Sequence, residues 1–221
     1  MGQLKVGGRL KVGILISGRG SNMAALAEAC AAPDFPAEIA LVLSDIPTAG
    51  GLALAAGRGI ATQAVDRKAY ASKPAFETAV DAALRAAGVE LICLAGFMRV
   101  LSADFVERWR DRILNVHPSL LPAFPGLDTH ARALAAGVKV AGCTVHVVRA
   151  VVDDGPILAQ VAVPVLDGDD PDSLAARILV EEHRCYPLAL RWVAEGRVAI
   201  DGGRARITGA AAASEALRNP L

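Results

Sequence analysis

The stretch VGILISGRGSNMAALAEA, residues 12–29, joins an apolar run to a glycine-containing loop and then to an alanine-rich segment. A short apolar run such as residues 12–17 is typical of a buried β-strand, and the alanine-rich segment from residue 21 favours a helix. A strand that passes through a tight loop into a helix is the repeating unit of α/β folds. Residues 12–32 are therefore predicted to form one such unit.

The same alternation continues along the chain. Further apolar runs predict strands at residues 39–44, 61–65, 89–96 and 112–116. Helical stretches are predicted at residues 21–32, 49–58, 73–87 and 102–110. Continuous apolar strands that alternate with helices are typical of a parallel sheet covered on both faces.

The rhythm changes in the last third of the chain. Two β-rich runs, residues 140–148 and 156–165, are separated by a short connection and predict an antiparallel addition to the sheet. A final helix is expected from about Asp172 to Glu195, followed by Gly196 as its end signal. We therefore expect one α/β domain, a Rossmann-like and mostly parallel sheet with helices on both faces and an antiparallel C-terminal addition. Residues 1–11 and 208–221 are expected to be loose termini.

Composition narrows the functional class. The chain has 221 residues, 53% hydrophobic and 21% charged, and a formal net charge of zero, which argues against broad affinity for nucleic acid or an acidic membrane. No run approaches the roughly 20 apolar residues of a membrane helix, and no secretory signal is visible. The four cysteines form no CxxC pair, so neither a zinc ribbon nor a thioredoxin-type site is indicated, and reduced thiols favour a cytoplasmic location.

The loop after the first predicted strand is a candidate phosphate site. Gly18 and Gly20 allow a tight turn, and the following helix offers free N–H groups and the positive end of its dipole. The loop lacks the GK[ST] of a Walker motif, and Met23 stands where a dinucleotide fingerprint needs glycine. The alternative is an ordinary strand-to-helix turn with Ser21 or Asn22 as the N-cap.

Asn115 and His117 lie two residues apart at the end of a predicted strand, so they share one face of it. Pro118 and Pro122 stiffen the loop that follows. Histidine exchanges a proton near neutral pH, and an asparagine amide can donate to an oxyanion, which together suggest acyl or formyl transfer. The alternative is a strand end capped by two polar residues.

The connection RAVVDDGPI, residues 149–157, supplies a third candidate. An aspartate from the pair Asp153 and Asp154 would orient His117 and favour its imidazolium form if the two met in space. An ordinary turn rich in Asp explains the same residues. Competing chemistry is weak, because the sequence has no HExxH and no GxSxG motif. His146 alternates with apolar neighbours and is interpreted as a core residue, and no metal site is expected.

Six motifs occur in order and carry a family resemblance. They are ISGRGSN (16–22), LAGFMRVLS (94–102), ILNVHPSLLPAFPGLDTH (113–130), GCTVHVV (142–148), VDDGPILAQ (152–160) and EEHRCYP (181–187). Together they resemble the phosphoribosylglycinamide formyltransferases (glycinamide ribonucleotide transformylases), folate-dependent formyltransferases of purine biosynthesis. The resemblance implies transfer of formyl from 10-formyltetrahydrofolate to the amine of glycinamide ribonucleotide.

The resemblance also implies roles for individual residues. Asn115, His117 and Asp153 match the catalytic trio, and Asp154 takes a variable place. The ribonucleotide is expected to contact Gly20, Ser21, Asn22 and Glu182. The folate is expected to contact Lys73, Met98, Arg99, Val100, Leu101, Asn115, Arg149, Ala150, Val151, Val152 and Asp153. Lys73 falls where the family often has arginine and lacks the planar fork of that side chain.

The resemblance divides the single domain into two functional halves. Residues 12–110 are expected to bind the nucleotide phosphate, and residues 111–200 to bind folate and carry the catalysis. Residues 119–132 are the candidate loop for closing over the folate. The partners expected are the two small-molecule substrates, with neither nucleic acid nor membrane, in a monomer or homodimer. The rival interpretations are a formyltetrahydrofolate hydrolase and a non-catalytic module that binds nucleotide or folate.

Overall fold

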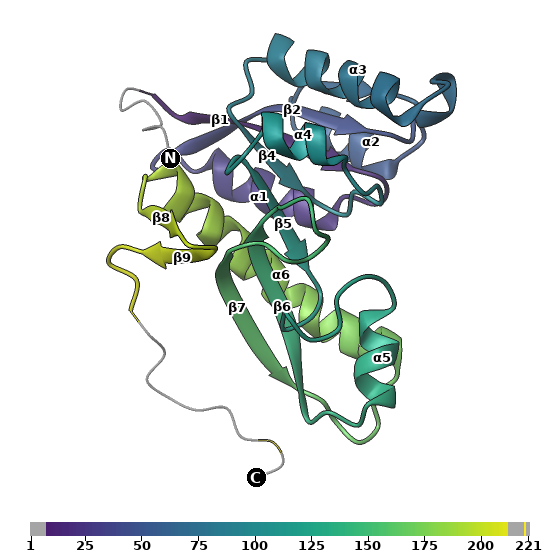
Figure 1. The fold of residues 1–221 in the computed structure, drawn as a ribbon, viewed down its shortest axis with the longest axis vertical. Helices are drawn as coiled ribbons and strands as arrows, with labels where there is room; N and C mark the ends of the chain where they lie inside the picture. Colours follow the sequence, from purple (N-terminus) through teal and green to yellow (C-terminus); the bar gives the residue numbers. More distant parts are fainter. Residues whose placement is uncertain (1–7, 212–218, 220–221) are drawn as a thin grey trace.

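The computed structural model describes residues 8–211 and residue 219 (Figure 1). Its strands are β1 Leu10–Ile16, β2 Ala37–Ser44, β3 Thr62–Ala64, β4 Leu91–Leu94, β5 Ile113–His117, β6 Val140–Val147, β7 Ile157–Pro164, β8 Val198–Asp201 and β9 Arg204–Ile207. Its helices are α1 Ser21–Ala31, α2 Gly50–Ala56, α3 Lys73–Ala86, α4 Ala103–Arg108, α5 Thr129–Ala135 and α6 Pro171–Ala194, with a 3₁₀ turn at Arg67–Ala69.

Seven strands form the main sheet in the order β3-β2-β1-β4-β5-β6-β7. The first five of these pair in parallel, whereas β6 is antiparallel to both β5 and β7. The predicted α/β class, the parallel sheet and the antiparallel addition are therefore confirmed. The strand order reverses between β1 and β4, and ligands of open α/β sheets bind at such a reversal, outside the carboxyl ends of the strands.

Side chains of the parallel strands alternate between two apolar layers, as strand geometry requires. In β1, Ile14 and Ile16 belong to the cluster that includes buried residues of α1 and α6, whereas Leu15 belongs to the cluster under α3 and α4. Figure 1 shows the long helix α6 running behind the sheet, whereas α4 lies in front of it and α3 lies along the top of the view. Both faces of the parallel part are thus buried, which explains its nearly continuous apolar strands.

Three details differ from the prediction. The first strand begins at Leu10, so part of the expected leader belongs to the sheet. The short helix α5 and the two-stranded β8–β9 sheet were not predicted, because seven-residue and four-residue elements give a weak periodic signal. Of the expected loose termini, residues 1–7, 212–218, 220 and 221 lie outside the described residues. No helix in the described part of the chain has the length and apolar character needed to cross a membrane.

Candidate active site

The loops after β1 and β4 lie together at the reversal of strand order. The backbone N–H of Ser17 donates to the carbonyl of Gly96 over 3.0 Å. The hydroxyl of Ser17 accepts from the backbone N–H of Met98 over 2.8 Å. The predicted phosphate loop (residues 17–22) and the first predicted folate loop (residues 98–101) are therefore joined directly at the carboxyl edge of the sheet.

The phosphate loop enters α1 through Gly20. Gly20 is the N-cap, in a left-handed conformation with φ of 80°, and no side chain caps the helix. The alternative interpretation had Ser21 or Asn22 as the N-cap; that assignment is wrong, because both residues are already helical. A Cβ on Gly20 would lie 2.8 Å from Cα of Gly51, so glycine also permits the close approach of α2. The uncapped N–H groups at the start of α1 remain suited to an anion.

Asn22 and Glu182, two residues expected to bind the ribonucleotide, meet across 160 positions of sequence. The Asn22 Nδ2 donates to Oε2 of Glu182 over 2.7 Å, and Oδ1 of Asn22 is buried with no partner in the described structure. Glu182 is only 6% exposed, and this burial raises the pKa of its carboxyl, while the hydrogen bond from Asn22 opposes the shift. The pair therefore presents a buried carboxyl and an unsatisfied amide oxygen beside the phosphate loop.

Asn115, His117 and Asp153 also come together. Asn115 and His117 lie on the same face of β5, and Nδ1 of His117 is 3.4 Å from Oδ2 of Asp153. Both side chains of this pair are nearly buried, at 8% and 9% exposed. Asp153 has a left-handed backbone, with φ of 55°, in the connection between β6 and β7. From the sequence, an aspartate could orient His117 only if the two residues were close in space. The structure places Asp153 beside His117.

The loop after β5 contacts the same residues. The carbonyl oxygen of Phe124 lies 3.1 Å from Nε2 of His117, and the N–H of Gly126 donates to Oδ2 of Asp153 over 2.8 Å. Both ring nitrogens of His117 therefore face oxygen acceptors. The loop predicted to close over folate touches the candidate catalytic residues through its backbone.

His146 is a member of this cluster that the sequence interpretation missed. It is buried as expected, at 2% exposed, but its Nε2 lies 3.2 Å from Nδ2 of Asn115 and 3.8 Å from Oδ1 of Asp153. The cause is register, since His146 is the direct partner of Asn115 in the antiparallel β5–β6 pair. Burial lowers the pKa of His146, partly opposed by its backbone hydrogen bond to Val147 and by the charge of Asp153.

Apart from Lys73 in α3 and Asn115 in β5, the residues expected to bind folate lie on two separate loops. Met98, Arg99 and Val100 are exposed after β4, and Leu101 is buried. On the other loop, Ala150, Val151 and Val152 are exposed, while Nη2 of Arg149 pairs with Oδ1 of Asp111 over 2.5 Å.

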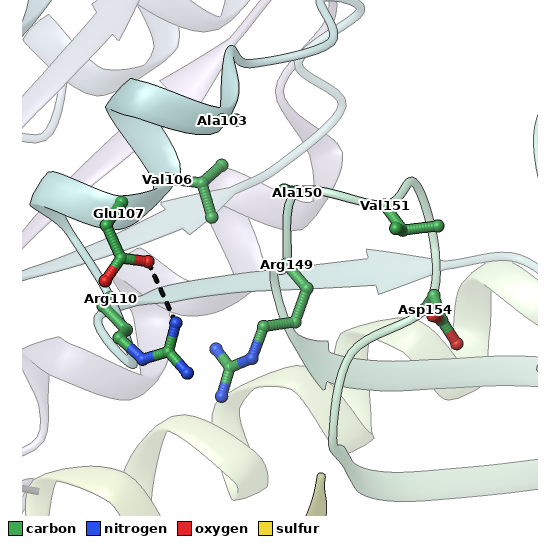
Figure 2. A pocket seen from close by; sticks show the side chains of 8 residues that line it. All are labelled: Ala103, Val106, Glu107, Arg110, Arg149, Ala150, Val151 and Asp154. Atoms are coloured by element: carbon green, nitrogen blue, oxygen red, sulfur yellow. Dashed lines mark hydrogen bonds and ion pairs between the residues drawn. The ribbon is translucent and has the colours of Figure 1, made fainter.

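A cavity of about 280 Å³ separates the second folate loop from α4 (Figure 2). Its lining residues are Ala103, Val106, Glu107, Arg110, Arg149, Ala150, Val151 and Asp154. Figure 2 shows Arg149 and Arg110 extending toward each other at one side of this cavity, with Arg110 bound to Glu107 over 2.9 Å. Three of the predicted folate residues therefore line a cavity, but Met98 to Leu101 do not line it.

Lys73 does not join either loop by a side-chain bond. It is the first residue of α3, its side chain is 44% exposed, and its ammonium lies 3.9 Å from Oε1 of Glu77. Glu77 in turn accepts from the backbone N–H of Ser102 over 2.7 Å. Among residues 8–211 and 219, no group of three or more His, Cys, Asp or Glu side chains is arranged to hold a metal ion.

Comparison with known proteins gives consistent likenesses. The sequence profile of the formyl transferase family matches residues 10–190. The chain is 38% identical over 200 residues to the phosphoribosylglycinamide formyltransferase of Escherichia coli (strain K12), covering 90% of this chain and 94% of that protein. It superimposes on a glycinamide ribonucleotide transformylase 1 from Symbiobacterium toebii with a TM-score of 0.89 and 50% identity, over 91% of this chain and 95% of that one.

Two further similar proteins limit what can be inferred about activity. The chain is 49% identical over 192 residues to the trifunctional purine biosynthetic protein adenosine-3 of Gallus gallus, covering 87% of this chain but only 19% of that protein. The chain thus spans only 14% to 20% of the length of the trifunctional relatives that it matches. A formyltetrahydrofolate deformylase from Pseudomonas syringae has a TM-score of 0.83 but 23% identity, which is a likeness of fold alone.

Proposed function

The chain belongs to the formyl transferase family, and we propose on that basis that it transfers a formyl group from 10-formyltetrahydrofolate to the amine of glycinamide ribonucleotide in purine biosynthesis. The observation that carries the proposal is the meeting of Asn115, His117 and Asp153 at the carboxyl end of β5. A binding module has no need of a histidine beside a carboxylate and an amide. Transfer through an oxyanion uses all three groups.

The reaction proceeds by direct attack. The ribonucleotide amine forms a bond to the formyl carbon, and the carbonyl electrons move onto oxygen to give a tetrahedral intermediate. The amine loses a proton, the bond between the formyl carbon and N10 of the folate breaks, and N10 takes up a proton. The products are the formylated amide and tetrahydrofolate, so atoms and charge balance without a covalent enzyme intermediate.

Asn115 and His117 act on the oxyanion in this proposal. The amide of Asn115 donates one N–H, and His117 supplies a second donor or passes the proton to the folate nitrogen. Asp153 orients the imidazole through Nδ1. The carbonyl of Phe124 lies against Nε2 of His117, so the loop must give up that contact for Nε2 to act on the substrate.

The two substrates approach from different loops. The phosphate of the ribonucleotide binds the uncapped start of α1 at Gly20, Ser21 and Asn22, and Glu182 accepts from the glycinamide end. The folate binds between the loop of residues 98–101 and the loop of residues 149–153, with Arg149, Ala150 and Val151 at the cavity between that second loop and α4. Lys73 is proposed to contact folate at the edge of the site, because its side chain is exposed; its one ion pair is with Glu77 and joins it to neither loop.

A mixing assay tests the function. The purified chain is incubated with 10-formyltetrahydrofolate, with and without glycinamide ribonucleotide, and tetrahydrofolate is measured. We expect tetrahydrofolate only when the ribonucleotide is present. Release without it would identify a formyltetrahydrofolate hydrolase, and no release in either mixture would identify a binding module.

The wider expectations belong to the same proposal. Residues 12–110 bind the nucleotide phosphate, and residues 111–200 carry the catalysis and much of the folate site. The protein acts in the cytoplasm as a monomer or homodimer on small molecules. The buried and unbridged state of Cys30, Cys93, Cys143 and Cys185 supports a reducing compartment.

A further inference from the structure

We propose that Asp45 is a positioning residue for this reaction, because its carboxylate joins the phosphate loop to Arg99 of the folate loop. The proposal rests on the formyl transfer proposed above. Asp45 follows β2 directly, so it reaches the same carboxyl edge of the sheet as Ser17 after β1 and Arg99 after β4.

The two oxygens of Asp45 are divided between the two loops. Oδ1 accepts from the hydroxyl of Ser17 over 2.6 Å, and Oδ2 accepts from Nε of Arg99 over 2.7 Å. Ser17 uses the same hydroxyl to accept from the N–H of Met98, next to Arg99. A closed set of three contacts therefore fixes the spacing between the start of one loop and the middle of the other.

Asp45 and Arg99 differ in exposure, so the buried carboxylate holds one end of an exposed guanidinium. The side chain of Asp45 is 1% exposed, whereas that of Arg99 is 47% exposed. The ion pair occupies Nε of Arg99, and no partner binds its two terminal nitrogens within the described structure. Asp45 thus anchors the inner end of the guanidinium and leaves the outer fork available for an anionic group of the folate. A long exposed side chain without such an anchor must lose more conformational freedom when it binds.

Substitutions at Asp45 separate the two contacts. Asparagine keeps an amide that can bond with the hydroxyl of Ser17, but it lacks the charge and the second acceptor for Arg99. Alanine removes both contacts. Asn therefore tests the link to the folate loop alone, and Ala tests both links.

The experiment compares Asp45→Asn, Asp45→Ala, Arg99→Gln and the double variant Asp45→Asn with Arg99→Gln. Steady-state KM is measured for each substrate, and the Kd of tetrahydrofolate is measured by calorimetry. The control is Asp169→Asn, which breaks an ion pair of similar burial with Arg177 (2.7 Å; Asp169 side chain 3% exposed) at the start of α6. This control lowers stability and leaves both KM values unchanged.

We expect Asp45→Asn to raise the folate KM and the Kd of tetrahydrofolate by about five- to tenfold, with the ribonucleotide KM unchanged. Asp45→Ala raises both KM values, and the double variant is no worse than Arg99→Gln, because Asp45 acts through Arg99. An active wild type with an unchanged folate KM and Kd in Asp45→Asn overturns the positioning role alone. An inactive wild type overturns the proposed function and this inference with it. If Asp45→Ala fails to fold, the Asn and Gln variants still decide the outcome.

Discussion

Asn115 and His146 face each other across the β5–β6 pair, with Nδ2 of Asn115 3.2 Å from Nε2 of His146. Burial lowers the pKa of His146 below its ordinary value of 6.5, which favours the neutral ring at neutral pH. Nδ1 faces the carbonyl of Val147 at 3.3 Å, so the neutral ring carries its proton there and accepts at Nε2. His146 can therefore fix the Asn115 amide with one N–H bound and the second free for the substrate.

Replacing His146 tests this orientation. We expect His146→Phe to lower kcat by about tenfold or more with little change in either KM, because the amide loses its acceptor. His146→Gln recovers part of the loss, since its side-chain oxygen can accept from Asn115. Initial-rate kinetics of both variants, with the folded fraction checked by circular dichroism, provide the measurement. A Phe variant that turns over like the parent would remove His146 from the mechanism.

Asp153 and its neighbour Asp154 form a matched pair in one turn. Asp153 contacts His117 and has φ of 55°, a conformation that asparagine tolerates, whereas Asp154 is exposed. Asp153→Asn is therefore expected to keep the fold and ribonucleotide affinity while kcat falls by about a hundredfold or more, as the imidazole loses its charged partner. Asp154→Asn should keep the wild-type kcat, and because Asp154 lines the cavity assigned to the folate, any change falls on the folate KM. Near-normal turnover in Asp153→Asn would refute the assigned role.

Most of the architecture was predictable because the signals are local. Each parallel strand is a short apolar run, and the turn from β1 into α1 is written in consecutive residues. Short elements escaped prediction, as α5 and the β8–β9 sheet illustrate. Their stability comes from packing on the rest of the molecule rather than from their own sequence.

The candidate site could be proposed residue by residue from the sequence, but its contacts could not. Spacing places Asn115 and His117 on one face, yet the partnership of Asn115 with His146 depends on β6 lying beside β5 in one register. The link from Asp45 to Arg99 likewise depends on strand order, since the residues are 54 positions apart. Such contacts follow from tertiary arrangement and leave no periodic trace in the sequence.

Gly20 is predicted to be indispensable where Gly18 is not. Gly20 has φ of 80°, and its added Cβ would lie 2.8 Å from the backbone of Gly51, whereas a Cβ on Gly18 would meet nothing within 4 Å. Gly20→Ala is expected to cost about 2 kcal/mol or more of the free energy of unfolding and to raise the ribonucleotide KM. Gly18→Ala should leave stability and KM close to wild type. Urea denaturation and initial rates compare the two variants, and equal behaviour would contradict the close contact between Gly20 and Gly51 described for the phosphate loop.

The carboxylate of Glu182 is expected to lower the stability of the protein while it contributes to ribonucleotide binding. Burial raises the pKa of its carboxyl above the ordinary value of 4.5, so its contribution to stability is full below pH 4.5 and is lost as pH rises through the higher folded value. Glu182→Gln avoids a buried charge and can still accept from Asn22. The variant should therefore gain stability over wild type with rising pH, while the ribonucleotide KM increases because the carboxylate is gone.

The control for Glu182 is its neighbour Glu181. Glu181 pairs with Arg184 over 2.8 Å near the surface, the Arg184 side chain being 72% exposed, so Glu181→Gln should change neither the pH profile of stability nor the ribonucleotide KM. Free energies of unfolding are measured in urea between pH 4.5 and 8 for both variants and the wild type. If the stability advantage of Glu182→Gln over wild type shrinks as pH rises, the buried carboxyl is stabilised as an anion. That outcome would overturn the raised pKa assigned to Glu182.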